Sequence, residues 1–184
     1  MAATVTYSWT SSDPRQSTLF TPRSVTESFA SSGTAFRFVT SSDNLGSHVT
    51  ELLAGTGRRE ERVARFEWKS GGGLGRVLLG RTQVQMADLC RPDPTNPMAR
   101  MFSAPDGNTY RWITNHTGDV LLYDNTGVHL ANYHTVRPFR TSIGDVYGEL
   151  SFVDNGSGAS LLPPFQRQAV ITCMLYRYCS MMRI

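Results

Sequence analysis

The first candidates for chemistry are a histidine, a tyrosine and a glutamate. His134 follows Tyr133 in a segment with strand-like alternation, and an imidazole titrates close to neutral pH, as a general base must. Glu67 is a second candidate base if its strand face lines a cavity, with Arg65 as its partner. Ordinary roles stay open, namely a strand-end hydrogen bond for His134 and a surface ion pair worth less than about 1 kcal/mol for Glu67. His134, Tyr133 and Glu67 are the catalytic candidates if the protein is an enzyme, which the sequence leaves undecided.

Arginine supplies almost all of the positive charge. Lys69 is the single lysine among 18 basic residues, and the net charge is +3. Guanidinium groups suit phosphate and carboxylate ligands, although GC-rich codons are the simpler explanation for this bias. The arginines are scattered and the net charge is small, so we expect no nucleic-acid partner.

A few arginines and aromatic residues are candidates for ligand binding. The segment 137–140 is expected to be a loop that presents two guanidiniums beside Phe139, which suits a membrane interface. In the alternative, Phe139 folds onto the protein. Trp68 and Trp112 each lie two residues from another aromatic residue, a spacing that gives core pairs or a ligand-stacking wall. The ligand-binding candidates are Arg65, Arg76, Arg111, Arg137, Arg140, Trp68 and Trp112.

No sequence pattern points to a metal or a cofactor. Cys90, Cys173 and Cys179 lack the Cys-x-x-Cys spacing of zinc sites. The glycine-rich segment 71–75 lacks both the lysine of a phosphate loop and the third glycine of a dinucleotide fingerprint. We therefore expect no metal, no cofactor and buried, reduced thiols.

Regular turn signals divide the middle of the chain into short strands. The segment 63–68 alternates apolar and polar residues, as a strand with one buried face does. Asp106-Gly107 and the segment 124–127 each separate two strand-like segments, as hairpin turns do. Further strands are expected at 35–40, 76–79, 101–104, 108–113, 120–123, 128–134 and 146–153. Together these patterns predict an antiparallel sandwich or barrel.

The C-terminal region has a different pattern. After Pro163-Pro164, residues 169–176 are apolar or nearly so in every direction, and a helix of that kind must be buried on all sides. Eight helical residues span about 12 Å, which is too short for a bilayer. A buried strand is the alternative, because residues 170–172 are β-branched. We expect a helix over about 164–182 that fills the inside of a barrel.

Length and composition indicate a single domain. The chain has 184 residues, which suits one domain. The start is polar and rich in Ser and Thr, with Pro14 and Pro22, so we expect residues 1–32 to be a flexible arm and residues 33–184 to be the domain. Residues 1–10 lack the basic and apolar regions of a secretory signal, which predicts a cytoplasmic protein.

Several short motifs follow one another in a familiar order. They are 65–68 (RFEW), 87–89 (ADL), 101–102 (MF), 106–107 (DG), 110–112 (YRW), 131–134 (ANYH) and the stretch 169–176. Over residues 33–182 this order resembles an uncharacterised domain family of mushroom-forming basidiomycete fungi. That family is related to the tubby C-terminal-like barrels, which include phospholipid scramblases and LURP-one proteins. The resemblance implies an antiparallel barrel of about twelve strands around a hydrophobic C-terminal helix. It also implies binding at a membrane surface, often to phosphoinositides, through basic residues.

Three functions remain open at this stage. The first is a non-catalytic binding module for an anionic, phosphoinositide-like lipid headgroup or a protein partner, cytoplasmic or peripheral to a membrane. The second is a small cofactor-free enzyme, of isomerase, cyclase or hydrolase type, acting on an apolar metabolite in a cavity of a few hundred Å³. The third is a self-assembling interaction protein that exposes Met181 and Met182.

Overall fold

The protein consists of one large antiparallel sheet and one long helix. The computed structural model describes residues 4–21, 34–42, 48–55, 60–104, 106–154 and 159–184. The strands are β1 (Thr4–Trp9), β2 (Thr18–Phe20), β3 (Thr34–Ser42), β4 (His48–Ala54), β5 (Glu61–Glu67), β6 (Arg76–Leu79), β7 (Thr82–Gln85), β8 (Arg91–Asp93), β9 (Asn96–Ser103), β10 (Thr109–Thr114), β11 (Val120–Asp124), β12 (His129–Arg140) and β13 (Asp145–Val153). The helices are the short η2 (Met86–Leu89) and η3 (Ala159–Leu161) and the long α1 (Pro163–Met182).

The strands pair mostly with their neighbours in sequence. The order across the sheet is β7-β6-β5-β4-β3-β2-β1-β13-β12-β11-β10-β9-β8. Among the described strands, only the pairing of β1 with β13 joins strands that are distant in sequence, and it places Trp9 opposite Gly148. Strand β1 thereby joins the two halves of the sheet.

The N-terminal segment is part of this sheet, so the prediction of an arm over residues 1–32 is wrong for β1 and β2. The side chain of Trp9 is completely buried, and that of Tyr7 is buried too. Thr6 Oγ1 and Ser151 Oγ lie 2.9 Å apart and share a hydrogen bond. The apolar area of the two rings stabilises β1 despite its polar neighbours. Residues 22–33 of the predicted arm lie outside the described residues.

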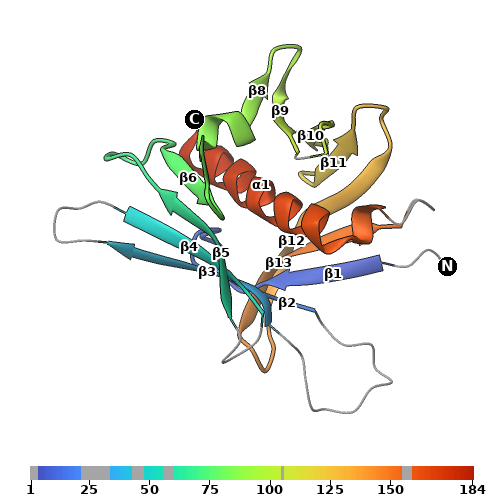
Figure 1. The fold of residues 1–184 in the computed structure, drawn as a ribbon. Helices are drawn as coiled ribbons and strands as arrows, with labels where there is room; N and C mark the ends of the chain where they lie inside the picture. The colour runs from blue at the N-terminus through green and yellow to red at the C-terminus, as the bar shows by residue number, and fades with distance from the viewer. Residues whose placement is uncertain (1–3, 22–33, 43–47, 56–59, 105, 155–158) are drawn as a thin grey trace.

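The predicted C-terminal helix is confirmed, and the sheet surrounds it. Strands lie on opposite sides of α1 in Figure 1, and its buried side chains run from Gln166 to Cys179. Trp112 Nε1 donates a hydrogen bond of 3.0 Å to Thr172 Oγ1, and Tyr7 Oη donates one of 2.7 Å to Gln166 Oε1. These bonds satisfy polar groups inside the core and fix the position of α1 along its axis. No helix of the described residues is long and apolar enough to cross a membrane.

The predicted barrel is found only in part. Across the described residues β7 and β8 are the edge strands of the 13-stranded sheet, and no ladder pairs them with each other. The chain passes between them through η2, which contacts α1 and buries Met86 and Leu89. The observed architecture is therefore a curved antiparallel sheet around one helix, with one strand more than the expected twelve.

Candidate functional site

The hairpin of β5 and β6 carries charged residues on its outer face. Along β5 the side chains of Ala64 and Phe66 are buried, whereas those of Arg65 and Glu67 are partly exposed. This alternation follows from the pleat, which turns successive side chains to opposite faces. Strand β6 places Arg76 directly opposite Glu67. The sequence pattern of this segment is therefore enough to collect three charged groups on one surface.

A glycine brings the backbone of this hairpin close together. A Cβ on Gly75 would lie 1.9 Å from the carbonyl oxygen of Glu67, which no real side chain tolerates. Lys69 N donates a hydrogen bond of 3.0 Å to Gly73 O, closing the turn between the strands. The glycine-rich segment therefore forms a tight hairpin connection, as its composition predicts.

The outer face of this hairpin contains a pocket of about 460 Å³, which we call the basic pocket. Glu67 Oε2 accepts a hydrogen bond of 2.5 Å from Arg76 Nε, and Glu67 Oε1 lies 3.5 Å from Arg65 Nε. Two guanidiniums thus contact a single carboxylate, and with Lys69 also in the lining the pocket has an excess of positive charge. The residues that define it are His48, Arg65, Glu67, Trp68, Lys69 and Arg76.

A second pocket, of about 480 Å³, lies beside the C-terminal half of α1. The guanidinium of Arg177 lies in the corner of two nearly perpendicular rings, 4.6 Å from the ring centre of Trp9 and 4.4 Å from that of Tyr133. Burial raises the pKa of Tyr133 to about 12, although the charge of Arg177 opposes this rise. The phenol therefore stays protonated at neutral pH. The residues that line this Arg177 pocket include Tyr133, Val136, Pro138, Tyr147, Arg177 and Met181, together with several uncharged Ser and Thr side chains.

The loop between β1 and β2 lies at the same end of α1. Arg15 stacks over the ring of Tyr178 with its Cζ 4.9 Å from the ring centre, and it pairs with Asp13 at 3.0 Å. Burial would raise the pKa of Asp13, but hydrogen bonds and charge from Arg15, together with the charge of Arg177, lower it. The Asp13 carboxylate is therefore held in its ionised form by two arginines.

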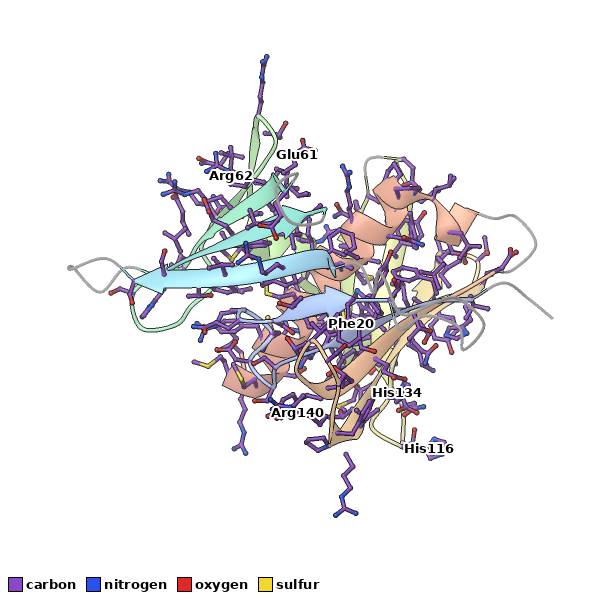
Figure 2. The ribbon with its side chains drawn as sticks, turned by 90° about the horizontal axis from the view of Figure 1, so that it is seen from below. Phe20, Glu61, Arg62, His116, His134 and Arg140 are labelled. Atoms are coloured by element: carbon purple, nitrogen blue, oxygen red, sulfur yellow. The ribbon has the colours of Figure 1, made fainter. Side chains whose placement is uncertain are left out.

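The structure does not bring the three catalytic candidates together. His134 lies within β12, and its Nε2 is 3.4 Å from Glu149 Oε2. Tyr133, the preceding residue, is buried against Arg177. Glu67 is on β5, six places from β12 in the sheet order. In Figure 2, His134 lies on the opposite side of the molecule from Glu61, at the start of β5. No acid–base pair forms among these three residues.

The remaining predicted ligand residues are dispersed. Arg111 Nη1 lies 3.3 Å from Asp93 Oδ2, and Trp112 is in the core against α1. The segment 137–140 belongs to β12, so its prediction as a loop is wrong, because Phe139 and Arg140 pair with β13. Arg140 forms an ion pair of 3.1 Å with Asp145. The ring of Phe139 is 46% exposed, so it does not fold onto the protein. Only Arg65, Trp68 and Arg76 of the predicted set share one pocket.

Arg15 and Arg177 are the residues of interest that the sequence did not indicate. The rings that contact Arg177 come from β1 and β12, more than 40 residues away along the chain in each case. No local spacing marks such a contact. The only usable signal was the alternation of Val5, Tyr7 and Trp9, which predicts a strand with aromatic residues on one face.

A metal site would require several ligand side chains close together in the described parts of the chain. Within them, no group of three or more His, Cys, Asp or Glu side chains is close enough together to hold a metal ion. The three cysteines are free and buried. Burial raises the pKa of the Cys173 thiol to about 12, so this thiol is protonated at neutral pH.

Comparison with known proteins identifies one family. Residues 12–149 match a family described as a "Family of unknown function (DUF6593)". The match begins inside the segment that the sequence analysis assigned to an arm. No curated protein and no solved structure matches the chain. The relation to tubby-like barrels and the fungal origin stay predictions.

Proposed function

Given that the chain belongs to DUF6593, a family of unknown function, we propose from its pockets that it is a non-catalytic module that binds an anionic lipid headgroup. The basic pocket is the headgroup site. The observation that carries the proposal is that Arg65, Lys69 and Arg76 line one pocket in which Glu67 is the single carboxylate. Arginine binds phosphate through paired hydrogen bonds, and lysine adds a point charge.

The distribution of titratable groups supports binding rather than catalysis. General acid–base catalysis needs a proton donor and acceptor within reach of one substrate, whereas His134 and Glu67 lie on distant strands. Glu67 Oε2 accepts a hydrogen bond of 2.5 Å from Arg76 Nε, so this carboxylate already has a partner. In the proposed module, Glu67 holds the two guanidiniums in position until phosphate oxygens compete for them.

The curved sheet around a buried helix also supports this proposal. The resemblance to the tubby C-terminal-like barrels implies phosphoinositide binding through basic residues on the outside of the sheet. The basic pocket is on that outer surface, beside the edge strand β7, which contributes Gln85 to its lining. In this proposal the fold is a barrel of tubby-like type, in which η2 takes the place of a closing ladder.

Flotation with lipid vesicles tests the proposal. The native protein should float with phosphatidylcholine vesicles that contain phosphatidylinositol bisphosphate and remain unbound with phosphatidylcholine alone. A basic residue near an anionic surface contributes about 1 kcal/mol, so Arg65→Gln with Arg76→Gln should weaken binding about thirtyfold. The matched control is Arg62→Gln with Arg91→Gln, which removes two exposed arginines outside the pocket.

One more variant separates the binding role of Glu67 from a catalytic role. Glu67→Gln removes the carboxylate that competes with phosphate, so it should raise vesicle affinity severalfold. Flotation of the arginine double variant at the native level would overturn the headgroup proposal. A fall in affinity in Glu67→Gln, with the fold retained, would contradict the assigned role of the carboxylate.

A further inference from the structure

The Arg177 pocket contains one charged side chain in an otherwise neutral lining. Among its described lining residues, Arg177 is the only one with a formal charge, and none is acidic. Val136, Pro138 and Met181 give it apolar walls, and Tyr133 and Tyr147 add aromatic rings. Ligand sites in proteins are mostly apolar, with a small number of polar groups that fix the orientation of the ligand.

The charge of Arg177 lacks a direct counter-ion in the described structure. No carboxylate lies within ion-pair distance of it there, and the nearby Asp13 is bound to Arg15 through both carboxylate oxygens. Arg177 Nη2 donates a hydrogen bond of 3.3 Å to Ser12 O. Arg177 Nη1 is buried and has no acceptor among the described residues. A buried donor without an acceptor is rare in native proteins and needs an explanation.

A second donor, next to Arg177, also lacks a hydrogen-bond acceptor among the described residues. This donor is Trp9 Nε1, which is buried. The Trp9 ring stacks on the guanidinium of Arg177, so two unsatisfied donors belong to neighbouring groups. Tyr133 contacts the same guanidinium with its ring nearly perpendicular to that of Trp9. A positive charge held in the corner of two rings needs little further ordering of its side chain to bind an anion.

From this combination we infer that the Arg177 pocket binds a small amphipathic monoanion, an aromatic or aliphatic carboxylate or sulfonate. The anionic group lies at the guanidinium of Arg177 and supplies the counter-charge that no described carboxylate provides at ion-pair distance. The apolar body lies against Val136, Pro138 and Met181. A polyanionic headgroup does not fit this description, because a single cation leaves its further negative charges without a charged partner.

This site is separate from the basic pocket. The two sets of lining residues have no member in common. The basic pocket has three cations and a carboxylate on the outer face of two strands, whereas the Arg177 pocket has one cation on α1. The inference therefore holds or fails independently of headgroup binding.

Two fluorescent probes that share an aromatic body and differ in charge test the inference. Anilinonaphthalene sulfonate carries one negative charge on an aromatic body, and N-phenylnaphthylamine is its neutral analogue. The folded protein should bind the sulfonate saturably, one molecule per chain. Hydrogen bonds to charged groups contribute enough that the neutral analogue should bind at least about tenfold more weakly. Equal affinity for the two probes would overturn the inference.

Two substitutions locate the probe. Arg177→Gln keeps polar atoms but removes the charge, and it should weaken sulfonate binding about tenfold while leaving the neutral analogue unchanged. Val136→Trp fills the pocket without removing Arg177 and should abolish binding of both probes. Val128→Trp places the same side chain at an exposed position outside the pocket and should bind like the native protein.

The second substitution keeps the test decisive if Arg177→Gln fails to fold. Native binding of the sulfonate to a folded Val136→Trp variant would show that the probe lies elsewhere, and the inference would be wrong. Loss of binding in Val136→Trp together with native binding in Val128→Trp supports it. Circular dichroism confirms that each variant is folded, because the sulfonate also binds partly unfolded chains.

Discussion

The basic pocket and the Arg177 pocket enclose nearly the same volume, about 460 Å³ and about 480 Å³, but they hold their arginines differently. Arg76 projects from the outer face of β6 and is fixed by the carboxylate of Glu67. Arg177 projects from α1 and is fixed by the rings of Trp9 and Tyr133. Volume alone therefore does not indicate what either pocket binds.

The difference lies in what remains of each guanidinium for a ligand. A carboxylate partner neutralises the charge of Arg76 and competes with any incoming anion. Aromatic partners attract the cation through the ring quadrupole, but they carry no net charge. The positive charge of the guanidinium is therefore not neutralised. An arginine stacked on rings is therefore the better anchor for a single anion. Where a carboxylate is present, several arginines must act together to bind an anion.

The largest expected effect concerns the backbone under the basic pocket. Gly75→Ala places a Cβ against the backbone of Glu67, at 1.9 Å, and backbone atoms cannot move aside as a side chain can. We expect a loss of about 3 kcal/mol or more in the free energy of unfolding, measured by urea denaturation. Gly73→Ala is the matched control, because its Cβ would make only ordinary contacts with Lys69. Equal stability of the two variants would contradict this account of the hairpin.

An intermediate effect distinguishes the two arginines directly. Arg177→Gln removes two cation–π contacts in a partly buried setting and should cost about 1–3 kcal/mol of unfolding free energy. Arg76→Gln removes a solvent-exposed ion pair and should cost less than about 1 kcal/mol. Thermal and urea unfolding of both variants provide the measurement. If Arg76→Gln were the more destabilising change, the comparison between ring-held and carboxylate-held arginines would be reversed.

The smallest expected effect is a pH dependence at the Arg177 end of the molecule. The pKa of Asp13 is lowered in the folded state, since Arg15 and Arg177 outweigh the effect of burial. The stabilisation is therefore complete above the unfolded-state pKa, near about pH 4, and is lost as the pH falls through the lower folded-state pKa. Solvent screens this half-exposed group, so the contribution should be under about 1 kcal/mol.

The variant Asp13→Asn checks this prediction. It should be less stable than the native protein at neutral pH and should lose less stability on acidification below about pH 4. Urea unfolding across the acidic range gives both slopes. Parallel slopes for the two proteins would show that Asp13 does not contribute to the acid sensitivity of this region.

Part of the fold could be predicted because its determinants are local. Asp124 Oδ1 accepts hydrogen bonds from the N–H groups of Thr126 and Val128, at 2.8 Å and 2.9 Å, and so forms the turn between β11 and β12 that the sequence predicts. The alternation around Phe66 likewise gives β5 its buried and exposed faces. In each case the interacting groups are a few residues apart.

The N-terminal strands and half of the candidate site could not be predicted in the same way. Strand β1 depends on pairing with β13, some 140 residues further along the chain, where Tyr7 lies opposite Leu150. The polar composition of residues 1–32 predicted an arm, whereas Tyr7 and Trp9 of β1 are buried. The basic pocket could be predicted in part, because Arg65 and Arg76 belong to one hairpin, whereas Arg177 could not be associated with Trp9.

Local patterns in the sequence were sufficient to predict β5, β6, β10 and β11 and the burial of α1. Apolar side chains around the whole circumference of residues 169–176 leave no face for water, so α1 must lie inside. Only the tertiary structure decided which arginines meet carboxylates and which meet rings. Those contacts join β1, β12 and α1, and contacts between segments so distant in sequence depend on the packing of the whole sheet rather than on any local spacing.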